Sequence, residues 1–113
     1  MITIYHNSRC SKSRDGVCFL ENSNIEFEIV NYIKNIPTAD ELKTILQKLN
    51  IPAIELVRKK EAIWIEKYKT KKLSENEIIQ AMIEHPNLIE RPIIISGNKA
   101  IIARPTEKIN EIL

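Results

Sequence analysis

A cysteine close to the start of the chain lies where a nucleophilic sulfur would be activated. Cys10 follows Arg9 and precedes Ser11-Lys12-Ser13-Arg14. The β-branched and aromatic residues 2–5 favour a strand and residues 11–22 have helical spacing, so Cys10 is expected beside a helix N-terminus. Unpaired backbone N–H groups, the helix dipole and nearby cations all stabilise a thiolate there. We therefore predict a reactive thiol whose pKa lies below the ~8.5 of a free cysteine.

The second cysteine, Cys18, is not placed to pair with the first. If both lie on one helix, eight residues at about 1.5 Å of rise separate their Cα atoms by ~12 Å, beyond the ~7 Å limit for a disulfide. A Cys10 adduct would then need an external thiol to resolve it. Two cysteines and two histidines, His6 and His85, also fit no zinc spacing, so no metal site is expected.

Arginine is rare in this chain, and its positions are informative. Twelve of the seventeen basic residues are lysines and five are arginines. Two arginines flank Cys10, two precede prolines in Arg91-Pro92 and Arg104-Pro105, and Arg58 follows an apolar run. Any one of them, taken alone, reads more simply as a surface salt-bridge residue. If they converge in space, however, they would form a bidentate anion site.

Composition excludes several other classes of protein. A length of 113 residues predicts a single domain, residues 1–113, and a net charge of +2 argues against nucleic acid as the main partner. No apolar run approaches the ~20 residues of a membrane span, and no signal-peptide pattern is visible, so we expect a cytosolic protein without a membrane partner. The basic and aromatic stretch 59–72 suggests either an RNA contact or a solvated face, and the solvated face is favoured.

Periodicity predicts an alternating order of strands and helices. Strands are expected over 2–5, 25–30, 92–95 and 100–103, and helices over 11–22, 38–49, 53–58, 74–84 and 105–113. Thr38 and Glu41 fit a capping box, His85-Pro86 ends the fourth helix, and Pro105 suits the first turn of the last one. The fold class is therefore α/β, in the order βαβ…ββα, with a helical insertion at about 38–85 between strands two and three.

This order resembles the thioredoxin fold, which has a cysteine after strand one and a proline, usually cis and facing that cysteine, at the start of strand three; Pro92 matches it. Over essentially its whole length the chain resembles one branch more closely, the ArsC family of glutaredoxin-coupled arsenate reductases. The resemblance rests on residues 4–7, 13–14, 56–59, 85–93 and 104–105.

The resemblance implies an enzyme, an arsenate reductase, and a set of site residues. Cys10 would attack arsenate or a related oxyanion, and three arginines would bind the oxyanion and its thiol adducts: Arg58, Arg91 and Arg104. Glutathione would then serve as co-substrate and glutaredoxin as partner, with arsenite released and no bound cofactor. We also expect a monomer.

Four further residues are expected to support the site: His6, Ser13, Arg14 and Pro92. For His6, positioning of the loop and a simple hydrogen bond to backbone are equally good interpretations. The loop residues Ser8-Arg9 and Ser11-Lys12 differ from the Pro-Ala and Gly-Thr of plasmid-type reductases and are typical of chromosomal ArsC-like proteins.

Other functions compete for the same residues. A phosphatase-like arsenate reductase needs Cys-x5-Arg, whereas Cys10 and Arg14 give Cys-x3-Arg. A Spx-like regulator, which binds RNA polymerase, typically carries Cys-x-x-Cys, and here Ser13 stands in the second place, which also disfavours a dithiol thioredoxin. The Spx-like regulator and a monothiol glutathione-linked oxidoreductase remain the alternatives. An inert buried thiol is disfavoured by the polar, cationic surroundings of Cys10.

Overall fold

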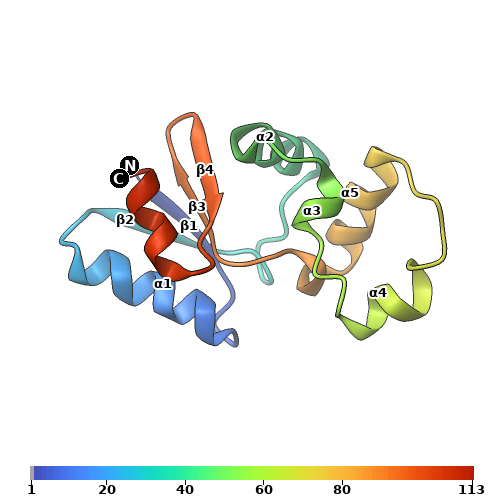
Figure 1. The fold of residues 1–113 in the computed structure, drawn as a ribbon, viewed down its shortest axis with the longest axis horizontal. Coiled ribbons are helices and arrows are strands. Elements are labelled where there is room, and N and C mark those ends of the chain that lie inside the picture. The colour runs from blue at the N-terminus through green and yellow to red at the C-terminus, as the bar shows by residue number, and fades with distance from the viewer. Residues whose placement is uncertain (1) are drawn as a thin grey trace. The chain divides into compact units, whose positions relative to one another are not determined.

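The chain folds into two compact units, which a computed structural model describes for residues 2–113. The first, here called the sheet unit, comprises residues up to Asn35 together with Arg91–Leu113. The second, here called the helical unit, comprises Ile36–Glu90. Figure 1 shows that all four strands belong to the sheet unit and that α2 to α5 belong to the helical unit. Within residues 2–113, no helix is long and apolar enough to cross a membrane.

The sheet unit is built on one mixed four-stranded sheet of order β2-β1-β3-β4. Its strands are β1 (Ile2–His6), β2 (Phe27–Asn31), β3 (Ile93–Ser96) and β4 (Lys99–Ile102). β1 pairs in parallel with β2, and the helix α1 (Ser11–Asn22) connects these two strands. On its other side β1 pairs antiparallel with β3. β3 and β4 form the predicted hairpin, whose tight turn contains Gly97 at φ +59°. The predicted α/β order is confirmed.

The core of the sheet unit lies between the sheet and two helical segments. α1 and the 3₁₀ helix η2 (Thr106–Glu111) cover the same face of the sheet in Figure 1. Ile4 and Ile94 from the central strands pack there with Leu20 and Ile109, and all four are inaccessible to solvent. Burying each such side chain stabilises the fold by roughly 1.5–3 kcal/mol, so these four residues contribute substantially to holding the two helical segments on the sheet.

One close approach in this core has a direct sequence cause. A Cβ atom placed on Gly16 would lie 3.0 Å from Pro92 Cγ and 3.3 Å from Ile4 Cδ1. Because real Cβ atoms do not tolerate the shorter separation without displacement, Gly16 allows α1 to lie directly on Pro92. The helix that follows Cys10 thus lies against the proline that immediately precedes β3.

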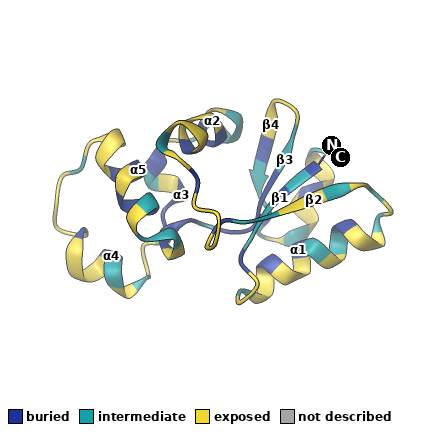
Figure 2. Ribbon diagram, turned by 180° about the vertical axis from the view of Figure 1, so that it is seen from behind, coloured by how far each residue is buried: buried dark blue, intermediate teal, exposed yellow. Residues whose placement is uncertain are grey.

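The edge strand β2 departs from its predicted pattern. It begins two residues later than expected, at Phe27, and Ile25 and Phe27 pack against the core as the alternation predicts. Ile29 continues the same alternation but is 50% exposed. β2 is an edge strand and pairs with β1 on one side only, so it is less covered than a central strand. Figure 2 shows the exposed stretch of β2.

The helical unit contains four α-helices and one 3₁₀ helix: α2 (Ala39–Leu49), α3 (Ala53–Leu56), α4 (Ala62–Lys67), α5 (Glu75–Glu84) and η1 (Pro86–Leu88). Complete capping boxes open α2 and α5, and the predicted one at Thr38 and Glu41 is confirmed. α5 packs against α2, α3 and η1, and Leu42, Leu56 and Met82 are buried between them.

Two segments of the helical unit differ from the sequence prediction. The helix expected over 53–58 ends at Leu56, because Val57 forms an antiparallel bridge with Ile89 and the Arg58 N–H donates to the Leu88 carbonyl at 2.7 Å. The basic stretch after it contains the short helix α4, in which Trp64 is buried and stacks on the buried Tyr68. The aromatic residues of this stretch therefore belong to the core, and its lysines are exposed.

The prediction for the last helix was wrong in type and boundary. The segment is the 3₁₀ helix η2, in which the Lys108 N–H donates to the Pro105 carbonyl three residues back. Pro105 is its N-cap and lies before the first turn. A segment this short gains little from α-helical propagation, and the burial of Ile109 against the sheet fixes its position.

Candidate active site

Cys10 occupies the predicted position at the start of α1. It is the N-cap residue, with extended backbone at φ −98° and ψ 122°. Its N–H donates to the Asn7 carbonyl at 3.0 Å, and its own carbonyl accepts the first helical bond from the Arg14 N–H at 3.0 Å. The loop after β1 thus closes into a turn and passes directly into the helix, which leaves the half-buried sulfur beside the first N–H groups of α1.

The pKa of the Cys10 thiol is lowered from its usual value. Partial burial opposes ionisation, but the backbone N–H groups of Ser13 and Lys12 and the guanidinium of Arg91 favour the anion and outweigh it. The direction of the shift agrees with the prediction, and the cation that contributes to it is Arg91, far along the chain from Arg9 and Lys12.

Arg104 and Arg91 lie together at the sulfur. Arg104 Nη2 is 3.5 Å from Cys10 Sγ, and Arg104 Nε donates to the Arg91 carbonyl at 2.8 Å. Arg91 contributes both a hydrogen bond and its charge to the thiolate, and is only 8% exposed. Two arginines separated by 13 residues in sequence are therefore brought together beside the Cys10 sulfur, and the oxyanion site expected of them and Arg58 stays a prediction.

Both arginines precede prolines whose peptide bonds are cis, Arg91-Pro92 and Arg104-Pro105. The resemblance led us to expect the first; nothing in the sequence pointed to the second. The Pro92 carbonyl accepts from the Ala103 N–H at 3.0 Å, which joins the segments that carry the two arginines.

A buried hydroxyl braces the loop before the cysteine. Ser13 is inaccessible to solvent, and its Oγ accepts from the Asn7 N–H at 3.0 Å and lies 2.7 Å from His6 Nδ1. His6 thus contacts the Ser13 side chain in the loop that leads to Cys10, and the Ser13 backbone also acts on its ring. Burial lowers the pKa of His6, a hydrogen bond with the Ser13 backbone opposes the shift, and the charge of Arg14 lowers the pKa further.

Two residues near the site have local roles. Arg14 is exposed and its Nη1 donates to the Ser8 carbonyl at 2.8 Å, so it fastens the loop from outside. Asn7, which was not selected from the sequence as a site residue, is 6% exposed, and its Oδ1 accepts from the Arg9 N–H at 3.1 Å. This Asx-turn could have been recognised from an asparagine two residues before a loop residue.

Arg58 belongs to the helical unit, where it lies opposite Glu90. Its Nη1 is 3.8 Å from Glu90 Oε1, and its side chain is 14% exposed. Sequence reasoning chose Arg58 but not Glu90, since a glutamate before Arg91 carries no distinctive pattern. That Arg58 binds the same oxyanion as Arg91 and Arg104 stays a prediction.

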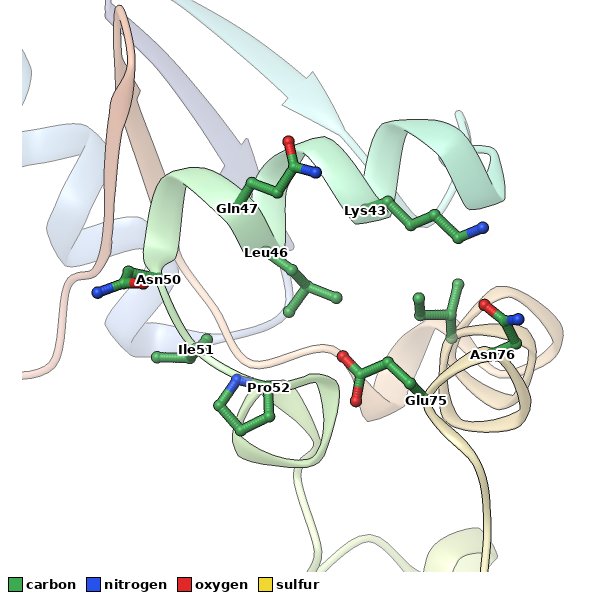
Figure 3. Close-up of a pocket in the computed structure, with 9 residues that line it drawn as sticks. Lys43, Leu46, Gln47, Asn50, Ile51, Pro52, Glu75 and Asn76 are labelled. Carbon is green, nitrogen blue, oxygen red and sulfur yellow. The ribbon is translucent and has the colours of Figure 1, made fainter.

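A pocket of about 500 Å³ lies elsewhere in the helical unit, between α2 and α5 (Figure 3). Glu75 turns its carboxylate toward Pro52 there and accepts the Ala53 N–H at 2.9 Å, so this acid is occupied in capping α3. The lining contains no cysteine, histidine or arginine. Across residues 2–113, no group of three or more potential metal-ligating side chains is gathered.

A mixed sheet with one crossover helix, and a cysteine at the start of that helix, define a thioredoxin-like α/β protein. Residues 5–112 match the model of the ArsC family, and the chain belongs to that family.

Similar proteins carry related names. The chain is 42% identical over 118 residues to an arsenate reductase of Haemophilus influenzae, covering 99% of this chain and 98% of that protein. It is 41% identical over 114 residues to "Uncharacterized protein YfgD" of Escherichia coli K12, covering 99% and 96%. The structure of an arsenate reductase from Vibrio cholerae matches with a TM-score of 0.94 at 38% identity, covering 99% and 97%. The chain is thus a homologue of arsenate reductases.

Proposed function

We propose that this protein reduces arsenate, or a closely related oxyanion, to arsenite, with glutathione as co-substrate and glutaredoxin as partner. The observation that carries the proposal is the contact between Arg104 Nη2 and Cys10 Sγ at 3.5 Å, beside a thiol whose pKa is lowered. A thiolate already paired with guanidinium groups is a nucleophile located where an anionic substrate would be held.

The first step forms a bond between sulfur and arsenic. The Cys10 thiolate attacks As(V) of arsenate, and one arsenate oxygen leaves as water after protonation. Arg91 and Arg104 reduce the repulsion between the two anions, because each guanidinium carries a permanent positive charge. Arg58 is proposed as the third oxyanion ligand on the strength of the family resemblance.

The remaining steps supply two electrons from two external thiols. Glutathione condenses with the arsenic of the Cys10 adduct and releases a second water. Glutaredoxin thiolate then attacks the glutathione sulfur, which forms the mixed disulfide and leaves As(III) on Cys10. Water hydrolyses this last bond, so the sum is H₃AsO₄ + 2 RSH → H₃AsO₃ + RSSR + H₂O. Cys18 lies on α1, which Cys10 caps, and both thiols are free, which fits a reaction that recruits its reductants from outside.

The test is arsenite production by the purified protein with arsenate, glutathione and glutaredoxin in an otherwise thiol-free buffer. Omission of either thiol component should stop turnover, and the Cys10→Ser protein should be inactive. If no arsenite forms, but a glutathione disulfide on Cys10 is reduced by glutaredoxin, a monothiol oxidoreductase replaces the proposal. If neither reaction occurs and the chain binds RNA polymerase, the Spx-like regulator replaces it. The abundance of reduced glutathione in the cytosol fits a cytosolic protein.

A further inference from the structure

The pair formed by Arg58 and Glu90 is unusual in being close without being hydrogen-bonded. Arg58 Nη1 and Glu90 Oε1 are 3.8 Å apart, which is an ion-pair distance but too long for a hydrogen bond. Arg58 Nε, Arg58 Nη1 and Glu90 Oε1 are all buried atoms with no hydrogen-bond partner. An arginine normally satisfies its N–H groups when its side chain is 14% exposed, because leaving them unmade is costly.

The backbone fixes this geometry. Val57 and Ile89 form an antiparallel bridge, the Arg58 N–H donates to Leu88 at 2.7 Å, and the Glu90 N–H donates to Leu56 at 2.8 Å. Residues one step beyond the bridged pair on each strand point to the same side, so Arg58 and Glu90 face each other diagonally across it. The two hydrogen bonds anchor both backbones on either side of the bridge, and the remaining gap reflects side-chain placement rather than a loose loop.

The surroundings strengthen the electrostatic interaction between the two charges. Leu56 and Leu88, on the same side of this short ladder, are both inaccessible to solvent. Charges beside such apolar side chains are screened less than charges in water, so Glu90 stabilises the Arg58 cation even without a hydrogen bond. The carboxylate thus supplies charge, while the buried donors of Arg58 remain unused.

We propose that Glu90 is an internal counter-ion that holds Arg58 ready for a tetrahedral oxyanion and is displaced from it when the oxyanion binds. The inference rests on the proposed function for the assignment of Arg58 to the oxyanion. Glu90 is a positioning residue that lowers oxyanion affinity, because an incoming anion must compete with the charge of its carboxylate. Before an oxyanion binds, that carboxylate balances the positive charge of Arg58.

The experiment measures oxyanion binding without turnover. Arsenate, phosphate and sulfate are each titrated by calorimetry into the Cys10→Ser protein, in which no arsenic–sulfur bond can form. Glu90→Gln removes the competing charge and should tighten binding of at least one oxyanion by about fivefold or more. Glu84→Gln removes one negative charge from an exposed position of α5 and is the matched control, which should leave affinity within about twofold.

A double-mutant cycle separates competition at Arg58 from a general charge effect. In an Arg58→Ala background, Glu90→Gln should give no gain, because the group for which Glu90 competes is absent. Glu90→Asp keeps the charge but withdraws the carboxylate by one methylene, and should give an intermediate gain. This variant also serves if the Gln protein fails to fold.

The outcomes distinguish this inference from the proposed function. A gain seen with phosphate or sulfate, in a protein that forms no arsenite, supports the counter-ion role while the arsenate reductase proposal fails. Normal arsenite production with unchanged or weakened binding in the Glu90 variants overturns the counter-ion role alone. A gain that persists in the Arg58→Ala background also overturns it. Absence of binding by all three oxyanions overturns both.

Discussion

The Cys10 loop and the Arg58–Glu90 pair treat their polar groups in opposite ways. In the loop, the Ser13 hydroxyl contacts both His6 and the Asn7 backbone, and the cysteine itself is surrounded by donors. In the pair, the facing atoms of Arg58 and Glu90 have no hydrogen bond at all.

The difference follows from what each region has to hold. A thiolate must exist before the substrate arrives, so its donors and cations must already be in place. In the proposed counter-ion role, Arg58 instead keeps its buried donors unused for an incoming anion, at some cost in stability. The comparison therefore predicts that disturbing the loop damages reactivity and folding together, whereas disturbing the helical unit leaves the thiolate intact.

The largest effect is expected at the sulfur itself. Cys10→Ser should abolish arsenite production, because a serine hydroxyl at this position is a far weaker nucleophile. Cys18→Ser should leave turnover within about twofold, since Cys18 is exposed on α1 and two turns from Cys10. Two equally inactive variants would point to an internal disulfide relay in which α1 melts, and the need for an external thiol would then have to be abandoned.

A smaller loss is expected when Arg91 keeps its charge but loses its planar shape. Arg91→Lys should slow adduct formation by about tenfold, because one ammonium cannot replace a guanidinium fork. The pH at which iodoacetamide reactivity of Cys10 rises should move upward, since Arg91 is one of the groups that lower this pKa. Reactivity is measured in the Cys18→Ser background, and Arg9→Lys, at an exposed position, is the matched change. An unchanged profile in Arg91→Lys would remove Arg91 from the thiolate's environment.

Stability enters this prediction because Arg91 is not a surface residue. If Arg91 were a surface residue, as the sequence alone suggests, its replacement by lysine would lower the free energy of unfolding by only about 0.5 kcal/mol. With 8% exposure the cost should be larger, because a buried cation with partners is being replaced.

The sequence predicted the features that depend on local patterns. The N-cap position of Cys10 and the capping box at Thr38 follow from residue types within a few positions of each other, and both were correct. The βαβ…ββα order followed from periodicities that the buried Ile4 and Leu20 satisfy. The end of α3 and the type of η2 were missed, because pairing of Val57 with Ile89 and packing of Ile109 depend on distant residues.

In the candidate site, too, local patterns identified some residues, while contacts between distant residues could not be predicted. Arginine rarity and the flanking prolines singled out Arg91 and Arg104, but no local pattern shows that Arg104 Nε donates to the Arg91 carbonyl. Glu90 was missed altogether, because its significance lies in a 3.8 Å separation from a residue 32 positions away in the chain.

The bracing of the loop can be tested by removing one oxygen. Ser13→Ala leaves the buried Asn7 N–H without its acceptor, and should lower the free energy of unfolding by about 1–3 kcal/mol. Denaturant unfolding measures the loss. Ser11→Ala, at an exposed position two residues earlier, makes the same chemical change and should cost less than about 0.5 kcal/mol. Equal losses in the two variants would show that the hydroxyl contributes nothing beyond helix N-terminal preference.

The smallest effect is expected in the helical unit, where the comparison predicts a stability change without a change in the thiol. Thr38→Ala removes the side-chain acceptor for the Glu41 N–H and should cost about 1 kcal/mol of unfolding free energy. Thr44→Ala lies in the interior of the same helix at an exposed position, and should be neutral or slightly stabilising, since alanine favours helices by up to about 0.7 kcal/mol. The alkylation profile of Cys10 should be the same in both, because Ser13, Lys12 and Arg91, which set its pKa, all belong to the sheet unit. A shifted profile in Thr38→Ala would show that the thiolate depends on the helical unit, and the separation of roles between the two regions would be wrong.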